Sequence, residues 1–108
     1  MFASMRRYRL QRGSMAELAR RVDEDFAGQL AAQPGFVSYE FIDCGFGEFM
    51  TMSIFLTLEQ AEASRELARR WADENREDLE FPRLEAAHGE ILLGRVAPIG
   101  LSSASTKS

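Results

Sequence analysis

Two helix-start signals of the same kind set the order of the elements in this chain. Ser14 and Thr57 each stand directly before a helical pattern, and Glu17 and Gln60 follow them three residues later. In such a capping box the hydroxyl accepts a hydrogen bond from an amide of the first helical turn, and the Glu or Gln side chain accepts one in return. We therefore expect two helices, with one strand before them, two strands between them and one strand after them.

The predicted order of elements is βαββαβ. Apolar residues recur at helical spacing over 14–32 and 58–78. Segments that alternate, or that are rich in aromatic and β-branched residues, predict strands over 5–11, 36–44, 48–57 and 85–96. This order within about 100 residues is typical of a ferredoxin-like α+β sandwich, in which two helices cover one face of a four-stranded antiparallel sheet.

The length of the chain, 108 residues, is that of one domain. We expect this domain to span residues 1–98. The remaining residues, 99–108, are almost all small and polar, and that composition predicts a disordered tail.

The strand predicted over 48–57 is apolar on both of its faces. One face carries Met50, Met52, Ile54 and Leu56, and the other carries Phe49, Thr51, Ser53 and Phe55. Because the two helices can cover only one face of the sheet, the other face needs a different cover. The sequence therefore predicts a homodimer that packs sheet against sheet and buries more than about 1,200 Å².

Composition argues against several classes of partner. A net charge of −4 disfavours nucleic-acid binding, because phosphate recognition needs clustered Lys and Arg. No apolar run approaches the ~20 residues of a membrane span, and the first residues lack the apolar region of a signal peptide. A single cysteine, Cys44, cannot form an intramolecular disulfide. These features predict a cytoplasmic protein that binds neither membrane nor nucleic acid.

Residues 73–85 form an acidic segment. It contains no His or Cys at the spacing of metal ligands. We interpret it as a solvated surface and expect no metal site.

The turn between the first predicted helix and the next strand resembles the corresponding turn of a known protein family. The turn Pro34-Gly35-Phe36, which leads into Ser38-Tyr39-Glu40-Phe41, is similar to the helix-to-strand joint of dimeric α/β-barrel proteins of the antibiotic-biosynthesis-monooxygenase type. A helix after Thr57 with Trp71 in its second half, and a last strand containing His88, extend the resemblance over residues 5–96. The resemblance implies two sheets paired into a barrel, with a ligand pocket between each sheet and its helices.

The same resemblance implies two kinds of activity. Some members oxidise aromatic substrates with dioxygen and no cofactor, others degrade haem, and many have no known activity. Haem-degrading members use an Asn on the first strand and a Trp and a His on the second helix, of which this chain has only Trp71, so we expect no cofactor. The cofactor-free oxygenases use Trp, Tyr, Asn and Arg around a quinol-like substrate, and the matching types here are Trp71, Tyr39, Asn75 and Arg7.

His88 is the candidate base, because it is the only histidine and its ordinary pKa lies near neutrality. The alternative is a histidine bonded to a backbone carbonyl or placed at the rim of the dimer. Trp71 and Tyr39 are the other catalytic candidates, with a place in the core as the alternative. Phe49 and Met52 are predicted to line an aromatic ligand, or else to belong to an ordinary core strand.

Three functions stay open at this point. The first is a cofactor-independent monooxygenase acting on an aromatic or polycyclic small molecule. The second is a non-catalytic dimer that binds a small apolar or aromatic ligand, and the third is an effector-binding module like those of some bacterial regulators. The first two differ in one geometric requirement, since the enzyme needs His88 and Trp71 in the same cavity.

Overall fold

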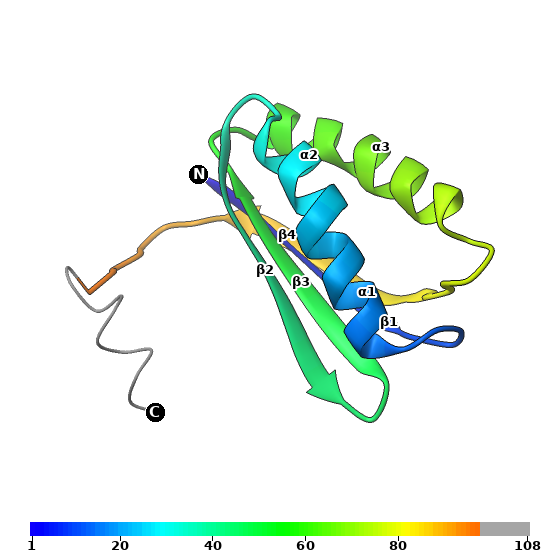
Figure 1. Ribbon diagram of the computed structural model, residues 1–108. Helices are drawn as coiled ribbons and strands as arrows, with labels where there is room; N and C mark the ends of the chain where they lie inside the picture. The colour runs from blue at the N-terminus through cyan, green and yellow to red at the C-terminus, as the bar shows by residue number, and fades with distance from the viewer. Residues whose placement is uncertain (98–108) are drawn as a thin grey trace.

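The structure, a computed structural model, describes residues 1–97. It contains one antiparallel sheet in the order β2-β3-β1-β4, with all helices on one face (Figure 1). The elements in chain order are β1 (Phe2–Arg9), α1 (Met15–Arg21), η1 (Val22–Phe26), α2 (Ala27–Ala31), β2 (Phe36–Gly45), β3 (Glu48–Phe55), α3 (Leu58–Glu74) and β4 (Arg83–Glu90). The predicted ferredoxin-like βαββαβ sandwich is confirmed. The predicted tail, 99–108, lies outside the described residues.

The boundaries differ from the predicted ones at the first and last strands of the chain and at the second helix. β1 begins at Phe2, where it pairs with Phe55, rather than at residue 5. β4 covers Arg83–Glu90 instead of 85–96, and its last bond to the sheet runs from the Ile91 amide to the Met1 carbonyl. α3 ends at Glu74, four residues early, where acidic side chains meet the negative end of the helix dipole.

The two predicted capping boxes differ in the structure. At Thr57 both bonds form, from the Gln60 amide to the hydroxyl and from the Thr57 amide to the Gln60 side chain, each at 3.2 Å. At Ser14 only the first forms, from the Glu17 amide to Oγ at 3.1 Å. The Glu17 carboxylate instead pairs with Arg20 and Arg21, each at 2.7 Å, and these bonds lower its pKa to about 2.

The first helical run contains a π-helical segment, η1, between α1 and α2. Its buried residues Leu18, Val22, Phe26 and Leu30 are spaced by four. An ordinary helix has 3.6 residues per turn, so residues spaced by four do not line up. Each one would be rotated a little further around the helix axis than the one before it. A turn with i→i+5 bonds unwinds the helix and keeps the four side chains facing the sheet.

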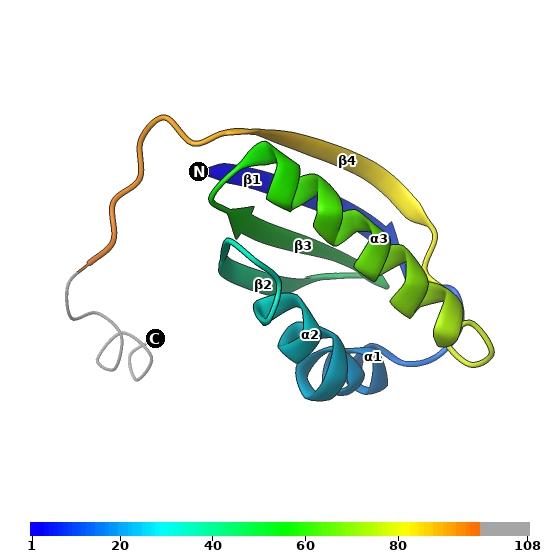
Figure 2. The ribbon, with the colours of Figure 1, turned by 90° about the horizontal axis from the view of Figure 1, so that it is seen from above.

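The sheet has one covered face and one open face. α3 packs over β1 and β3, and α2 packs over β2 (Figure 2). In β3 every second residue from Phe49 to Phe55 is buried, and the residues between them are half-buried, as the alternation predicted. We call the opposite side the open face; its members on the two central strands are Ala3, Met5, Arg7, Arg9, Glu48, Met50, Met52 and Ile54.

Among residues 1–97, no helix is both long enough and apolar enough to cross a membrane.

Candidate functional site

A cavity lies between the covered face of the sheet and the helices. Its volume is about 50 Å³, which is room for about four water molecules. The residues that line it come from the first helical run, α3, the three strands β1, β2 and β3, and the segment before β4: Arg6, Tyr8, Leu18, Val22, Phe26, Leu30, Tyr39, Phe41, Phe49, Thr51, Ser53, Ser64, Ala68, Trp71 and Phe81.

Seven of the fifteen residues that line the cavity are aromatic. The Phe26 ring contacts both Trp71 and Tyr39, with ring centroids 5.5 and 5.7 Å away. Phe49, on the floor of the cavity, stacks against Tyr8 at 4.9 Å and against Phe41 at 4.8 Å. Such tilted and offset contacts suit the charge distribution of aromatic rings. The wall is therefore suited to a flat, apolar ligand.

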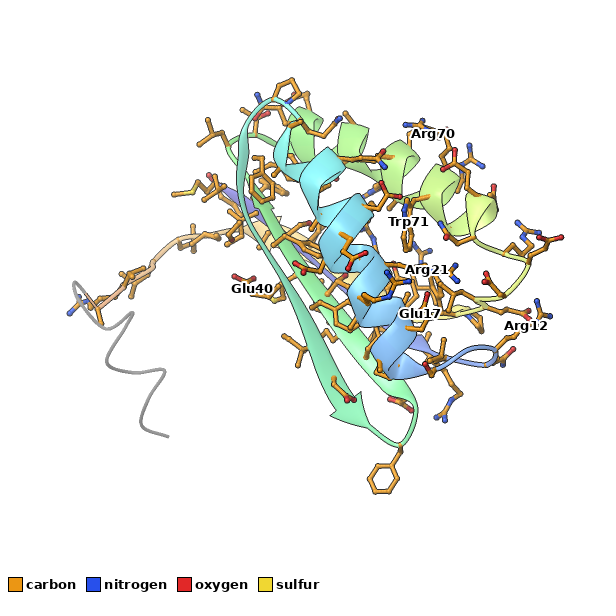
Figure 3. The ribbon with its side chains drawn as sticks, in the orientation of Figure 1. Arg12, Glu17, Arg21, Glu40, Arg70 and Trp71 are labelled. Carbon is orange, nitrogen blue, oxygen red and sulfur yellow. The ribbon has the colours of Figure 1, made fainter. Side chains whose placement is uncertain are left out.

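Trp71 is held in place from the first helical run. Its indole N–H donates to Asp25 Oδ2 at 2.8 Å, and Gln29 donates to the other carboxylate oxygen at 2.8 Å. These two bonds, the Trp71 bond foremost, lower the pKa of Asp25. Trp71 is 4 % exposed and lies on the side of α3 that faces the first helical run (Figure 3). With its N–H occupied, the indole offers the cavity only apolar surface.

Sequence reasoning missed Asp25. The residue belongs to η1, next to Phe26, and it follows Val22 by three residues, which puts it at the edge of the buried stripe. That spacing was the available signal. Such π-helical turns occur often at functional sites.

The three larger polar side chains of the lining are Arg6, Tyr8 and Tyr39, and the small hydroxyl residues Thr51, Ser53 and Ser64 line it as well. Burial raises the pKa of both tyrosines, and the positive charge of Arg6 acts against that rise in each case. Both hydroxyls therefore stay protonated at neutral pH and can donate hydrogen bonds. Within the described residues, the lining contains no carboxylate and no imidazole.

Three of the residues predicted for the site line this cavity: Trp71, Tyr39 and Phe49. The other four do not. Met52 and Arg7 lie on the open face, where Arg7 pairs with Glu48 at 2.9 Å and with Glu85 at 3.2 Å. Strand alternation accounts for this placement, since their chain neighbours Thr51 and Arg6 face the helices.

Asn75 has a structural position at the end of α3. Its Nδ2 donates to the Trp71 carbonyl at 2.9 Å, and its Oδ1 accepts from Arg21 at 3.1 Å. Arg21 also pairs with Asp78, so this cluster ties α1 to the segment after α3. Asn75 thus supports the backbone of Trp71 from outside the cavity.

His88 lies on the exposed edge strand β4, outside the cavity lining. It stands opposite Ser4, and its nearest aromatic neighbour among the described residues is Phe2, with centroids 6.2 Å apart. The geometric requirement for a His88 base, a cavity shared with Trp71, is not met. The structure offers no metal site in its place, since residues 1–97 contain no group of three His, Cys, Asp or Glu side chains that could hold an ion.

Comparison with known proteins identifies the fold. No family model matches the chain, and no curated protein matches it in sequence. Solved structures do match. A Nitrosomonas europaea protein of unknown function has a TM-score of 0.70 at 17 % identity, over 89 % of this chain and 93 % of that one.

Two further matches carry a description. SnoaB, a cofactor-independent oxygenase from Streptomyces nogalater, has a TM-score of 0.64 at 18 % identity, over 86 % of this chain and 94 % of its own. A dimeric ferredoxin-like protein from an uncultured marine organism has a TM-score of 0.66 at 12 % identity, over 89 % and 98 %. Others are provisionally described as antibiotic biosynthesis monooxygenases. The chain therefore has the fold of this group, as the resemblance in its sequence predicted.

Proposed function

We propose that this protein is a homodimer that binds a small aromatic ligand in the cavity between sheet and helices, without a cofactor. The observation that carries the proposal is the cavity itself, whose lining combines seven aromatic rings with a few polar side chains, Arg6, Tyr8 and Tyr39 foremost. Ligand sites usually combine an apolar lining with a few polar groups in this way. Trp71, Tyr39 and Phe49 are the residues that both the sequence and the cavity lining put forward.

The cavity must widen before it can hold a ring. A cavity of about 150 Å³ admits benzene, whereas this one measures about 50 Å³. Phe26 is the side chain whose movement would open it, because its ring lines the cavity and contacts both Trp71 and Tyr39. Phe26 also belongs to η1, where the helix departs from regular geometry. We therefore assign the binding step to a shift of Phe26.

Trp71 is the only tryptophan in the chain and lines the cavity, so the fluorescence of the protein reports directly on this site. In the experiment, toluene is added while Trp71 fluorescence is recorded for the wild type and for Phe26→Ala. Removal of the Phe26 ring should create the missing space, so the variant should bind toluene about tenfold or more tightly than the wild type. Phe46→Ala is the matched control, because Phe46 is 99 % exposed at the β2–β3 turn.

Phe46→Ala should behave like the wild type in this titration. Thermal unfolding shows whether Phe26→Ala keeps the fold. If Phe26→Ala is folded and Trp71 fluorescence does not respond to toluene, the cavity is not a ligand site.

A second function, oxidation of an aromatic substrate by dioxygen, is favoured by the fold shared with SnoaB. The lining within residues 1–97 provides no carboxylate or histidine as a general base. This alternative therefore requires a substrate that ionises readily without a protein base. An oxygen electrode with a hydroquinone as the probe separates it from binding alone.

A further inference from the structure

The cavity carries a positive charge with no counter-charge among the residues that line it. Arg6 is the only cationic side chain in the lining, and no carboxylate is present there. Within residues 1–97, Arg6 forms no ion pair, whereas its neighbour Arg7 pairs with Glu48 and Glu85 on the open face. A guanidinium beside an apolar cavity is an expensive arrangement unless an anion joins it.

Two hydroxyl donors stand beside this charge. Arg6 and Tyr8 follow each other on the covered face of β1, Tyr39 lies on β2, and all three side chains line the same cavity. No side-chain hydrogen bond in residues 1–97 uses the Tyr39 hydroxyl, although its ring is half-buried. The cluster Arg6–Tyr8–Tyr39 thus offers a guanidinium and two hydroxyl donors to the cavity, and the lining within residues 1–97 has no carboxylate to accept from them.

We propose that the ligand is a planar aromatic compound with a single anionic oxygen group, which binds to Arg6, Tyr8 and Tyr39 while its ring lies against Phe26 and Trp71. The inference rests on the proposed function, since it names the class of ligand for the same cavity. Arginine binds carboxylate and phenolate oxygens through charge-assisted hydrogen bonds, which are about twice as strong as neutral ones. The surrounding rings lower the local dielectric and strengthen this attraction.

The test compares benzoate with benzamide, which share a ring and a shape and differ in charge. Titrations followed by Trp71 fluorescence should show that the wild type binds benzoate about tenfold or more tightly than benzamide. Arg6→Gln should lose this preference and keep its affinity for benzamide. Arg70→Gln removes the same charge from the outer side of α3 (Figure 3) and should keep the preference.

A second probe, para-nitrophenol, distinguishes a phenolate ligand from a carboxylate ligand. The absorbance of its ionised form reports its own pKa, which the wild type should lower and Arg6→Gln should not. A benzoate preference without this shift assigns the anion as a carboxylate. The shift without a benzoate preference assigns it as a phenolate, and either result supports the inference.

Equal affinities for benzoate and benzamide, together with an unshifted para-nitrophenol, overturn the inference and leave the proposed function standing. Failure of every probe to bind the wild type and Phe26→Ala overturns both. If Arg6→Gln does not fold, Arg6→Lys retains the charge and should retain the preference. Loss of the preference in a folded Arg70→Gln would also contradict the assignment to Arg6.

Discussion

Trp71 connects the hydrophobic core to the cavity and is fixed from two directions. Its indole N–H is bound by Asp25, and its carbonyl accepts from Asn75. Both partners lie outside the cavity lining. The Asp25 bond therefore fixes the orientation of the ring, and the Asn75 bond fixes the backbone that carries it.

The bond between Asp25 and Trp71 predicts a specific acid sensitivity. The pKa of Asp25 is lowered in the folded protein, chiefly by the Trp71 N–H and then by Gln29. The ionised carboxylate therefore stabilises the fold above the ordinary carboxyl pKa of about 4, and this contribution is lost as the pH falls through the lowered pKa.

Urea unfolding near pH 7 and near pH 3 measures this effect, with Trp71 fluorescence as the signal. The wild type should lose more stability on acidification than Asp25→Asn does. Asp23→Asn, at an exposed site in the same segment, is the control and should lose as much as the wild type. Equal acid sensitivity of Asp25→Asn and the wild type would contradict the prediction.

At the scale of elements, the joint between α2 and β2 depends on a glycine. Gly35 has a φ of +78°, and a Cβ placed there would lie 1.7 Å from the Gln60 side chain. That side chain completes the capping box at Thr57. Gly35→Ala should therefore cost about 1–2 kcal/mol for the left-handed backbone and about 1 kcal/mol more for the disturbed cap.

Gly28→Ala is the matched substitution, and it should change the stability of the fold in the opposite direction. Gly28 lies in α2, and nothing is within 4 Å of the position of its Cβ. An alanine in a helix interior should stabilise the protein by about 0.5–1 kcal/mol. Urea unfolding of both variants checks the pair: a loss of stability in Gly28→Ala would contradict the prediction for α2, and unchanged stability of Gly35→Ala would contradict the prediction for the joint.

Local sequence signals predicted the order and type of the elements well. The end of the last strand and the π-helical segment depend on contacts between residues that are distant in the chain. Thr57 with Gln60, and the alternation from Phe49 to Phe55, depend on neighbours in the chain, so the sequence alone reveals them. The end of β4 depends on how far β1 extends beside it, which no local pattern records. η1 was missed for a related reason, because Val22 and Phe26 suit a regular helix until the whole stripe is compared with the sheet.

The same reasoning at the scale of the molecule explains what was missed in the site. The alternation of side chains along a strand puts Arg6 and Tyr8 on one face of β1, and Arg7 and Arg9 on the other face. Both faces of β1 carry arginine, however, so its sequence does not tell which face meets the helices. The packed structure does, and it brings Arg6 to the cavity in place of Arg7.

The open face predicts the state of assembly. Met5, Met50, Met52 and Ile54 are half-buried on a surface that no helix covers. A second copy that packs there would bury them, and light scattering should give twice the 12.2 kDa of one chain. Met52→Glu would place a charge in that contact at a cost of several kcal/mol, so this variant should give a mass near 12.2 kDa.

Ala63→Glu adds the same charge to the exposed surface of α3 and is the control. It should leave the mass at that of the wild type. A wild type that scatters as a single chain at micromolar concentration would contradict a dimer built on the open face.

The alternation of β3 has a consequence for how such a chain can change through evolution. Phe49, Thr51 and Ser53 line the cavity, whereas Met50 and Met52 belong to the open face. Neighbouring positions point to opposite sides and do not touch each other's surroundings. Substitutions at every second codon can therefore alter the lining of the cavity while the open face is preserved, so the proposed ligand site and the proposed dimer contact can diverge independently within a single strand.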